Sequence, residues 1–383
     1  MIRVGFGVSA LAKGIKANGL DGIGNYTNAL LTQFSKHTDL SLTPFSFDTE
    51  FQAFDRLVRP QNATVHLGNY ALNTAWSVAT GANFLGIQAL TKQIDLLHAT
   101  DHYVPKGKPV PLVATLMDAM PLSHPQWSRG KLRSIKNWLW TRAANWADEV
   151  ITISEYSKIE LSTWAGIPLK KITVIPLGVD ERWFREVSSL ETARVRAQYQ
   201  LPETFFISVG TLQPRKNIER TISAHRLLSQ AERLRSPLMI VGRAGWKCDE
   251  ALRLIDEDAA TGAVRWLQHV PDADLLAVLK LATALVFPSL GEGFGLPVLE
   301  AFAAGVPVIT SNTTSLPEVT GDAAIAINPL DVDQLKEAMR QVLQDEALVK
   351  RLKARGLKRA QSFTWQACTA STLQVYQRVV QQH

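Results

Sequence analysis

Short, continuous apolar runs recur along this chain, and segments with helical periodicity separate many of them. The runs that read as strands are 2–6, 95–98, 112–116, 150–153, 172–175, 205–209, 238–241, 284–287 and 308–310. Strands that are apolar on both faces are typical of parallel sheets covered by helices on both sides. Helical patterns that could supply this cover lie at 27–35, 131–147, 218–232 and 273–280. The sequence therefore predicts a doubly wound α/β fold.

The chain is long enough for two such sheets. At roughly 150 residues per domain, its 383 residues suggest two to three domains, most simply two. Proline and glycine follow a strand near 176–183, and a charged stretch then leads to a new strand. We predict an N-terminal domain over 1–180 and a C-terminal domain over 181–360. The helical stretch 361–383 has no strand of its own to cover, so we expect it to pack on the first domain.

Composition narrows the class of protein. The 41 Lys and Arg against 35 Asp and Glu give a net charge of +6, which suits an anionic substrate or membrane but does not predict nucleic acid binding. The two cysteines, Cys248 and Cys368, provide neither a disulfide framework nor a Cys-based metal site. We find no secretory signal and no run of about 18 apolar residues. These features predict a cytoplasmic protein.

Two common kinds of site fit the sequence poorly. GFGVSA at 5–10 has the spacing of a dinucleotide-binding fingerprint, but the chain stays glycine-rich through Gly24, so we do not expect a helix to open at once. Asp-x-Asp pairs at 256/258, 272/274 and 331/333 could suggest a metal–diphosphate site. However, PDADLLAVL reads as a helix start with acids in its first turn, and the other pairs lie in helix or turn context. No metal is expected.

A basic pair follows a predicted strand in FFISVGTLQPRKNIERTI. After the glycine at Gly210, Arg215 and Lys216 come directly before a helix, with Asn217 as the expected N-cap. Two cations beside a helix N-terminus, at the carboxyl end of a parallel strand, indicate an anion site. The alternative is a solvated basic pair without a ligand.

A glycine-rich loop precedes a second helix in SLGEGFGLPVLEAFAAGVPVITSN. The segment 291–295 has three glycines, and proline near its start and glycine after its end predict a helix over 296–304. Glu292 lies on the loop and Glu300 lies eight residues later on the helix. Carboxylates there can accept hydrogen bonds from sugar and ribose hydroxyls while the cations and backbone N–H groups hold phosphate.

These segments resemble the retaining glycosyltransferases of family 4. Glu292 and Glu300 have the E-x7-E spacing of that family, with GTLQPRKN upstream and SLPEV downstream. In the N-terminal half the likeness rests on GLDGIGNYTNALL, HATDHYVP and VATLMDAMPLSHP, and it is nearest to bacterial polysaccharide mannosyltransferases that use GDP-mannose. The resemblance implies the GT-B fold, in which two Rossmann-like domains face a cleft, and a reaction without a bound metal or other cofactor.

The resemblance also implies roles for individual residues. Arg215 and Lys216 would hold the donor diphosphate, and Glu292 would contact hydroxyls of the transferred sugar. Glu300 would hold the ribose, and the backbone around Val270 in 269–271 would read the base. Further donor contacts are expected at Gly22, Gly24, Gly210, Phe294, Gly295 and Leu296.

The chain departs from the family at one position. Members commonly have His-Asp where this sequence has Met117-Asp118. Methionine cannot supply the hydrogen bonds of an imidazole. We therefore expect Asp118 and a neighbouring histidine to support the sugar or the acceptor. His98 is the favoured histidine, with His102 and His124 as further candidates. The alternative for Asp118 is that it only caps the following turn.

The residues and the resemblance together predict a retaining hexosyltransferase. It would move mannose from GDP-mannose onto a saccharide or lipid-linked saccharide acceptor in polysaccharide biosynthesis. Alternatives are a UDP-sugar-dependent transferase of the same family, a nucleotide-sugar 2-epimerase, and a non-enzymatic scaffold suggested by Met117.

A contact with an anionic membrane is also expected, on the inner face. The segment 127–146, WSRGKLRSIKNWLWTRAANW, interleaves basic residues with tryptophans, as interfacial segments do. The alternative is an ordinary helix whose tryptophans belong to the core.

Overall fold

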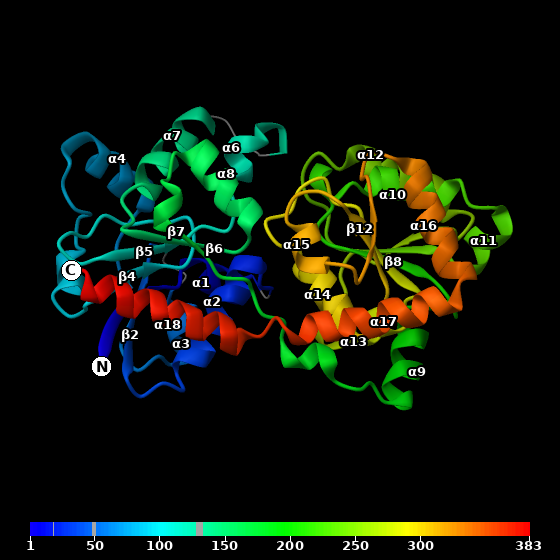
Figure 1. Cartoon of the computed structure of the whole chain (residues 1–383), viewed down its shortest axis with the longest axis horizontal. Coiled ribbons are helices and arrows are strands. Elements are labelled where there is room, and N and C mark those ends of the chain that lie inside the picture. The colour runs from blue at the N-terminus through cyan, green and yellow to red at the C-terminus, as the bar shows by residue number, and fades with distance from the viewer. Residues whose placement is uncertain (18, 48–50, 128–132) are drawn as a thin grey trace. The chain divides into compact units, whose positions relative to one another are not determined.

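The computed structural model describes residues 1–17, 19–47, 51–127 and 133–383 (Figure 1). The chain forms two compact units. The first contains Met1–Gly178 together with Trp365–His383, and the second contains Val179–Thr364. Each is built around its own parallel sheet, which confirms the predicted α/β architecture.

The first sheet has the strand order β3-β2-β1-β4-β5-β6-β7 in the described residues, and its strand pairs are parallel. The strands are β1 (Ile2–Gly7), β2 (Leu40–Ser46), β3 (Val65–His66), β4 (Leu96–Ala99), β5 (Leu112–Thr115), β6 (Glu149–Thr152) and β7 (Ile172–Val174). The order reverses direction between β1 and β4. Open α/β sheets bind ligands at such a point, beyond the carboxyl ends of the strands.

The helices of the first unit come from both ends of the chain. They are α1 (Ser9–Lys16), α2 (Gly22–Phe34), α3 (Phe51–Val58), α4 (Tyr70–Thr80), α5 (Gln88–Thr91), α6 (Met120–Ser123), α7 (Arg133–Ala144), α8 (Glu155–Ala165) and α18 (Trp365–Gln381). The C-terminal helix α18 packs against α2 and buries Tyr376 completely, so it completes this unit as the sequence predicted.

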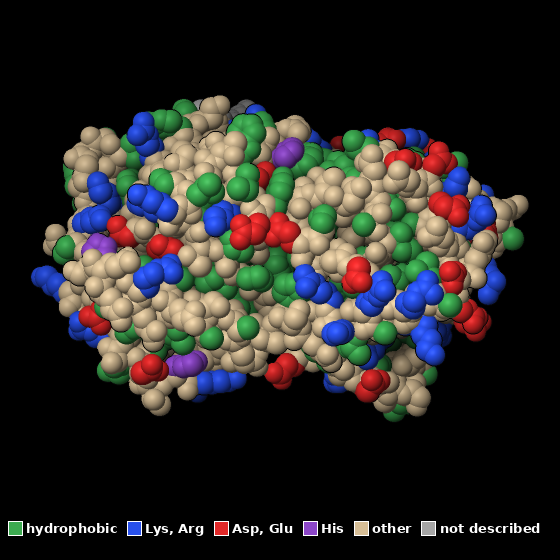
Figure 2. Space-filling view, in the orientation of Figure 1, with side chains coloured by type: hydrophobic (Ala, Val, Ile, Leu, Met, Phe, Trp, Pro, Cys, Tyr) green, Lys and Arg blue, Asp and Glu red, His purple; other side chains and the backbone are tan. Residues whose placement is uncertain are grey.

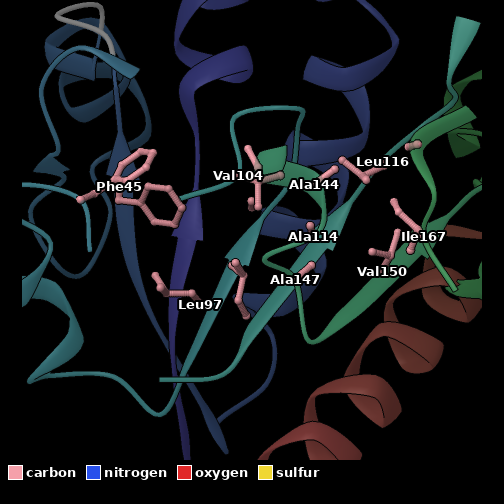
Figure 3. Close-up of a cluster of buried hydrophobic side chains, with 14 of the residues drawn as sticks. Phe45, Leu97, Val104, Ala114, Leu116, Ala144, Ala147, Val150 and Ile167 are labelled. Carbon is pink, nitrogen blue, oxygen red and sulfur yellow. The ribbon is translucent and has the colours of Figure 1, made fainter. Parts of the chain in front are cut away.

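The core of the first unit lies between the sheet and its helices (Figure 3). Apolar side chains from the strands meet small residues of α7 and the end of α8. The residues labelled there are Phe45, Leu97, Val104, Ala114, Leu116, Ala144, Ala147, Val150 and Ile167. Strands that are buried on both faces need such continuous apolar runs, which explains why these strands were visible in the sequence.

The second sheet has the order β10-β9-β8-β11-β12-β13 in the described residues, again with parallel pairs. Its strands are β8 (Phe206–Val209), β9 (Leu238–Val241), β10 (Val264–Trp266), β11 (Ala284–Phe287), β12 (Val308–Ser311) and β13 (Ile325–Ile327). Here the order reverses between β8 and β11.

The helices of the second unit include two short turns of 3₁₀-helix, η3 (Glu181–Phe184) and η4 (Pro214–Lys216). The others are α9 (Ser189–Gln198), α10 (Ile218–Arg226), α11 (Gln230–Arg235), α12 (Asp249–Ala259), α13 (Asp272–Lys280), α14 (Leu296–Ala303), α15 (Leu316–Thr320), α16 (Val332–Gln344) and α17 (Glu346–Gln361).

Three local expectations are wrong. A helix does open directly after β1, because α1 begins at Ser9. The predicted helix over 218–232 is divided into α10 and α11, since Ser229 and Glu232 form a capping box that starts a new helix. Asn217 occupies the N-cap position of α10, but its backbone is left-handed and its side chain does not cap. Its amide instead donates to the carbonyl oxygens of Pro288 and Pro329, at 2.9 and 2.7 Å.

Among the helices of the described ranges, none combines the length and the apolar character needed to cross a bilayer.

Candidate functional site in the second unit

The predicted anion site lies where the second sheet reverses direction. Arg215 and Lys216 belong to η4, which follows β8, and Glu292 lies on the loop that follows β11. Because β8 and β11 are parallel neighbours, their carboxyl ends meet at the same edge of the sheet. The three side chains are thereby brought together from segments far apart in the sequence.

One carboxylate oxygen joins the two cations. Oε1 of Glu292 lies 2.7 Å from Nζ of Lys216 and 2.7 Å from Nη1 of Arg215. Arg215 also donates to the carbonyl oxygen of Gly291 at 3.0 Å. Lys216 and Glu292 are buried, with side chains 9% exposed, whereas the Arg215 side chain is 25% exposed. The cluster is a buried ion pair with a second cation at its solvent side.

The surroundings shift the pKa values of this cluster. Burial lowers the pKa of Lys216 to about 8, although Glu292 opposes the shift. Burial alone would raise the pKa of Glu292, but Arg215 and Lys216 outweigh it and bring the pKa to about 2. At neutral pH the cluster therefore holds two cations against one carboxylate. A net positive, water-poor site of this kind attracts an anionic ligand.

Two glycines allow the loops at this edge to pack closely. Gly210 has a φ of +141°, and a Cβ there would lie 3.2 Å from Cε of Lys216. Gly242, after β9, has a φ of +152°, and a Cβ there would lie only 1.9 Å from the carbonyl oxygen of Gly210. Both backbone conformations are strained for residues with side chains. The close approach fixes the loop that carries Arg215 and Lys216.

The glycine-rich loop ends at the N-terminus of α14. Gly295, the N-cap residue, has a φ of +116°, and a Cβ there would lie 2.7 Å from Cδ2 of Leu316. The Ser315 hydroxyl holds the loop by bonding to the carbonyl oxygens of Glu292 and Phe294, at 2.8 and 3.0 Å. No side chain caps α14. The positive end of the helix dipole at Leu296 thus has no side-chain oxygen bound to it.

Glu300 lies one turn into α14 and is partly buried. Burial raises its pKa to about 7, and the nearby charges of Asp272 and Asp180 act in the same direction, whereas Arg182 acts against them. Glu300 therefore gains its charge near neutral pH.

Val270, expected near the base, is buried between β10 and α13. Since β10 pairs with β9, this segment leaves the sheet at the same edge as Gly210. Gly22 and Gly24 belong to the first unit, where they begin α2, and Asp21 accepts a hydrogen bond from the N–H of Gly24 at 2.8 Å.

The Asp-x-Asp pairs serve other purposes. Asp258 pairs with Arg226 at 2.7 Å, Asp274 pairs with Arg194 at 2.5 Å, and Asp331 caps α16. In the described part of the chain, no three His, Cys, Asp or Glu side chains are arranged to hold a metal ion.

Comparison with known proteins places these features in a family. Residues 191–359 match the family "Glycosyl transferases group 1", and residues 21–183 match "Glycosyltransferase Family 4". A glycogen synthase of Mycobacterium tuberculosis is 30% identical over 328 residues, which are 79% of this chain and 75% of that protein. The chain belongs to glycosyltransferase family 4.

Other relatives are mannosyltransferases by name. The O-antigen chain mannosyltransferase B of Escherichia coli is 38% identical over 228 residues, 59% of this chain and 60% of that protein. The serotype-specific mannosyltransferase WbdA of Escherichia coli is 32% identical over 238 residues, 61% of this chain and 29% of that protein. The match thus spans less than two thirds of either relative.

The fold matches that of solved structures along nearly the whole chain. Anabaena Alr3699/HepE, determined in complex with UDP and glucose, has a TM-score of 0.75 at 16% identity, covering 99% of this chain and 100% of that one. WaaG, a glycosyltransferase of lipopolysaccharide biosynthesis, has a TM-score of 0.71 at 15% identity, covering 97% and 98%. These likenesses confirm the GT-B fold, with two Rossmann-like units.

The first unit of this family 4 chain corrects the expectation for His98. Its side chain is completely buried on β4, with Nδ1 2.5 Å from the Tyr376 hydroxyl and Nε2 2.8 Å from that of Thr115. Burial lowers its pKa to about 3. Both ring nitrogens are thus occupied by core hydroxyls, so His98 is a neutral core residue and not a sugar contact.

Asp118 lies three residues beyond β5 and is partly exposed. Its Oδ1 accepts a hydrogen bond from the N–H of Met120 at 3.0 Å, so it does form the turn cap that was the alternative. The other two histidines contact tryptophans: His102 lies against Trp140, and His124 stacks on Trp127 with centroids 4.1 Å apart.

Asp101 is a further site candidate that was not expected from the sequence, and it follows β4 at the point where the first sheet reverses. Its side chain is buried, and burial raises its pKa. It accepts hydrogen bonds from the N–H groups of Tyr103 and Ala10, at 2.9 and 3.3 Å. The signal was available in HATDHYVP, because an acid directly after an apolar strand occupies the edge where α/β sheets bind ligands.

Proposed function

We propose that this chain is a retaining glycosyltransferase that moves a hexose from a nucleotide sugar to an acceptor. The observation that carries the proposal is the cluster of Arg215, Lys216 and Glu292 at the reversal point of the second sheet, next to the glycine-rich start of α14. Family membership supports the same reaction class.

The proposed chemistry is electrostatic. As the bond between sugar and diphosphate breaks, negative charge grows on the phosphate oxygens. Arg215, Lys216 and the N-terminus of α14 are held in place before the reaction, so they stabilise this charge without reorganising. A donor phosphate oxygen can take the proton of the attacking hydroxyl on the same face, which gives retention without a protein nucleophile. Neither step needs a metal ion, so EDTA should leave turnover unchanged.

The two glutamates have separate proposed roles. Glu292 would accept hydrogen bonds from hydroxyls of the transferred sugar, because its low pKa keeps it ionised throughout the physiological range. Glu300 would accept hydrogen bonds from the ribose, with backbone groups of Gly210, Phe294, Gly295, Leu296 and Val270 as further donor contacts. From the first unit, Gly24 and Asp118 would serve the distal phosphate and the acceptor side.

We further propose GDP-mannose as the donor and a saccharide or lipid-linked saccharide as the acceptor. The support is that relatives at 38% and 32% identity are named mannosyltransferases of O-antigen or serotype synthesis. The protein would then act in polysaccharide biosynthesis at the cytoplasmic face of a membrane.

A thermal-shift series with GDP, UDP and ADP tests the donor. A nucleotide that binds only the folded protein raises its unfolding free energy by RT ln(1 + [L]/Kd), about 2.7 kcal/mol at 100 times Kd. We expect stabilisation by GDP, and its loss in Arg215→Ala. Stabilisation by UDP alone would disprove GDP-mannose and favour a UDP-sugar transferase. Conversion of UDP-GlcNAc to its C2 epimer, without transfer, would indicate an epimerase instead.

The predicted membrane segment 127–146 has weaker support. Residues 128–132 lie outside the described residues. Of its tryptophans, Trp140 and Trp146 pack against the core of the first unit, as the alternative interpretation requires, and Trp138 is 51% exposed. Arg142 lies over the Trp138 ring, 5.6 Å from its centroid. An interfacial role of this segment would therefore rest on Trp138, Lys136 and Arg142.

A further inference from the structure

The helix α17 concentrates positive charge. Its sequence, EALVKRLKARGLKRAQ, has six cations within ten residues, and its one acid is Glu346 in the first turn. The whole chain has a net charge of +6, equal in number to these six cations. With Glu346 included, the helix carries a net charge of +5, so the rest of the chain holds only +1 and nearly all of the excess charge resides on one helix.

Most of these cations have no internal partner. Arg355 pairs with Asp322 at 3.2 Å, and Arg359 donates to carbonyl oxygens of α15. The other four are exposed and form no ion pair with any described residue: Lys350, Arg351, Lys353 and Lys358. By contrast, the preceding helix α16 pairs both of its cations, Lys336 and Arg340, with acids one turn earlier.

This arrangement costs helix stability. Lys350 and Lys353 are three residues apart, and Arg351 and Arg355 are four apart, so like charges are neighbours on the helix surface. Glu346, four residues before Lys350, and the helix dipole near Lys358 offset part of this repulsion, but none of the four exposed cations forms an ion pair with a described acid. An anionic partner outside the chain would offset the rest.

A groove runs beside this face. It has a volume of about 410 Å³, and Lys350 and Lys353 lie on its rim with Glu346. Apolar side chains of α16 and α17, Val342 and Val349, line it together with Ala282 and Thr283. In Figure 2, blue side chains gather over the band where Figure 1 draws α17. The face thus combines unpaired cations with an apolar recess.

We propose that α17 and this groove bind the surface of an anionic phospholipid bilayer. The four unpaired cations contact lipid phosphates, and the recess between α16 and α17 accepts apolar parts of a lipid next to the headgroup held by Lys350 and Lys353. A bilayer fits better than a nucleic acid because α17 contains no aromatic residue on which bases could stack, whereas the exposed apolar residues Ala354 and Leu357 lie among the cations.

Vesicle co-sedimentation with the full chain tests this surface. The vesicles are phosphatidylcholine alone, or phosphatidylcholine mixed with phosphatidylglycerol. The test variant is the triple substitution Lys350→Gln, Lys353→Gln and Lys358→Gln. The control removes the same charge from exposed lysines of the first unit, through Lys36→Gln, Lys92→Gln and Lys170→Gln.

We expect the unaltered chain to bind only the anionic vesicles. This binding should be lost near 1 M salt, where the Debye length is about 3 Å. Each cation near such a surface contributes enough that removing three should weaken binding about 100-fold. The vesicle affinity of the control variant should stay within about threefold of that of the unaltered chain. Replacing the same three lysines of α17 with arginine should retain binding.

Several results would overturn the inference. These are binding of the α17 variant at the level of the unaltered chain, equal loss in the control, or sedimentation with poly(A) RNA but not with vesicles. Binding abolished by Lys136→Gln with Arg142→Gln, but not by the α17 variant, would assign the surface to α7 instead. The GDP thermal shift should be the same in the α17 variant, so the outcome is independent of the proposed function.

Discussion

Lys216 and Glu292 form a buried ion pair, 2.7 Å between Nζ and Oε1, across the point where the second sheet reverses direction. The pair joins the segment after β8 to the loop after β11. Removing one partner of a buried pair leaves the other charge uncompensated, which typically costs about 3–5 kcal/mol. Here Arg215 also contacts Glu292, so the two substitutions Lys216→Ala and Arg215→Ala need not have the same effect.

The cations should matter for the chemical step. We expect Arg215→Ala and Lys216→Ala each to lower kcat by about 100-fold or more, because each removes a charge that acts on the leaving diphosphate. Lys216→Ala should also lower the unfolding free energy, since Lys216 is buried, whereas the more exposed Arg215 should cost less. Steady-state kinetics and urea unfolding measure both. Turnover within a few-fold of the unaltered enzyme in both variants would refute the anion site.

Activity should decline in mildly alkaline solution. The pKa of Lys216 in the ligand-free protein is about 8, so the cation is lost as pH rises past that value. We expect kcat/KM to fall above pH about 8, and the alkaline limb to move upward in Lys216→Arg, whose guanidinium stays charged. A pH profile that is the same in both proteins would assign the limb to another group.

The Lys216–Glu292 pair should also change how the unfolding free energy depends on pH in acidic solution. Glu292 has a folded pKa of about 2 against an ordinary value of 4.5, so the unfolded chain binds more protons between these values. Its stabilising contribution is complete above pH 4.5 and is lost as pH falls toward 2. We expect Glu292→Gln to flatten this part of the stability curve, as measured by urea unfolding at several pH values. An unchanged slope would contradict the low pKa.

His98→Ala should act on stability and not on chemistry. The substitution leaves a cavity and two buried hydroxyls, those of Tyr376 and Thr115, without their partner. We expect a loss of about 2–4 kcal/mol in unfolding free energy. At a temperature where the variant is folded, kcat should be near normal. A large fall in kcat with unchanged stability would restore the catalytic role first expected for this residue.

Asp118→Asn separates a turn cap from a functional carboxylate. Asparagine can accept the hydrogen bond from the N–H of Met120, so the turn should persist. If the charge supports the sugar or acceptor, kcat should fall at least tenfold while GDP affinity stays within about twofold. Unchanged kcat in Asp118→Asn, together with destabilisation in Asp118→Ala, would make the residue a cap alone.

The sequence predicted the strands that are continuous and apolar, and it missed those that are not. β2 escaped notice because Ser41, Thr43 and Pro44 interrupt it, although it pairs with β1 along its whole length. The others missed were β3, β10 and β13, which are two or three residues long and lie at sheet edges, where little apolar surface is needed.

For the site, local signals identified the right residue types but not their partners. Arg215, Lys216 and Glu292 each lie in a recognisable segment. However, only the pairing of β8 with β11 brings the two cations to 2.7 Å from the Glu292 carboxylate. His98 was misjudged for a related reason. Its Tyr376 partner is on the last helix, 278 residues away, and a strand-end histidine shows nothing of this in the sequence.

The helix α18 gives the chain an unusual order of assembly. Tyr376, buried against His98 of β4, leaves the ribosome only after the entire second unit has been made. At roughly 5–20 residues per second, the first unit therefore waits on the order of tens of seconds with its α2 face uncovered. The second unit is one continuous segment, Val179–Thr364, so it can complete its fold before α18 is made. During synthesis the apolar α2 face of the nascent first unit is thus uncovered until α18 is made.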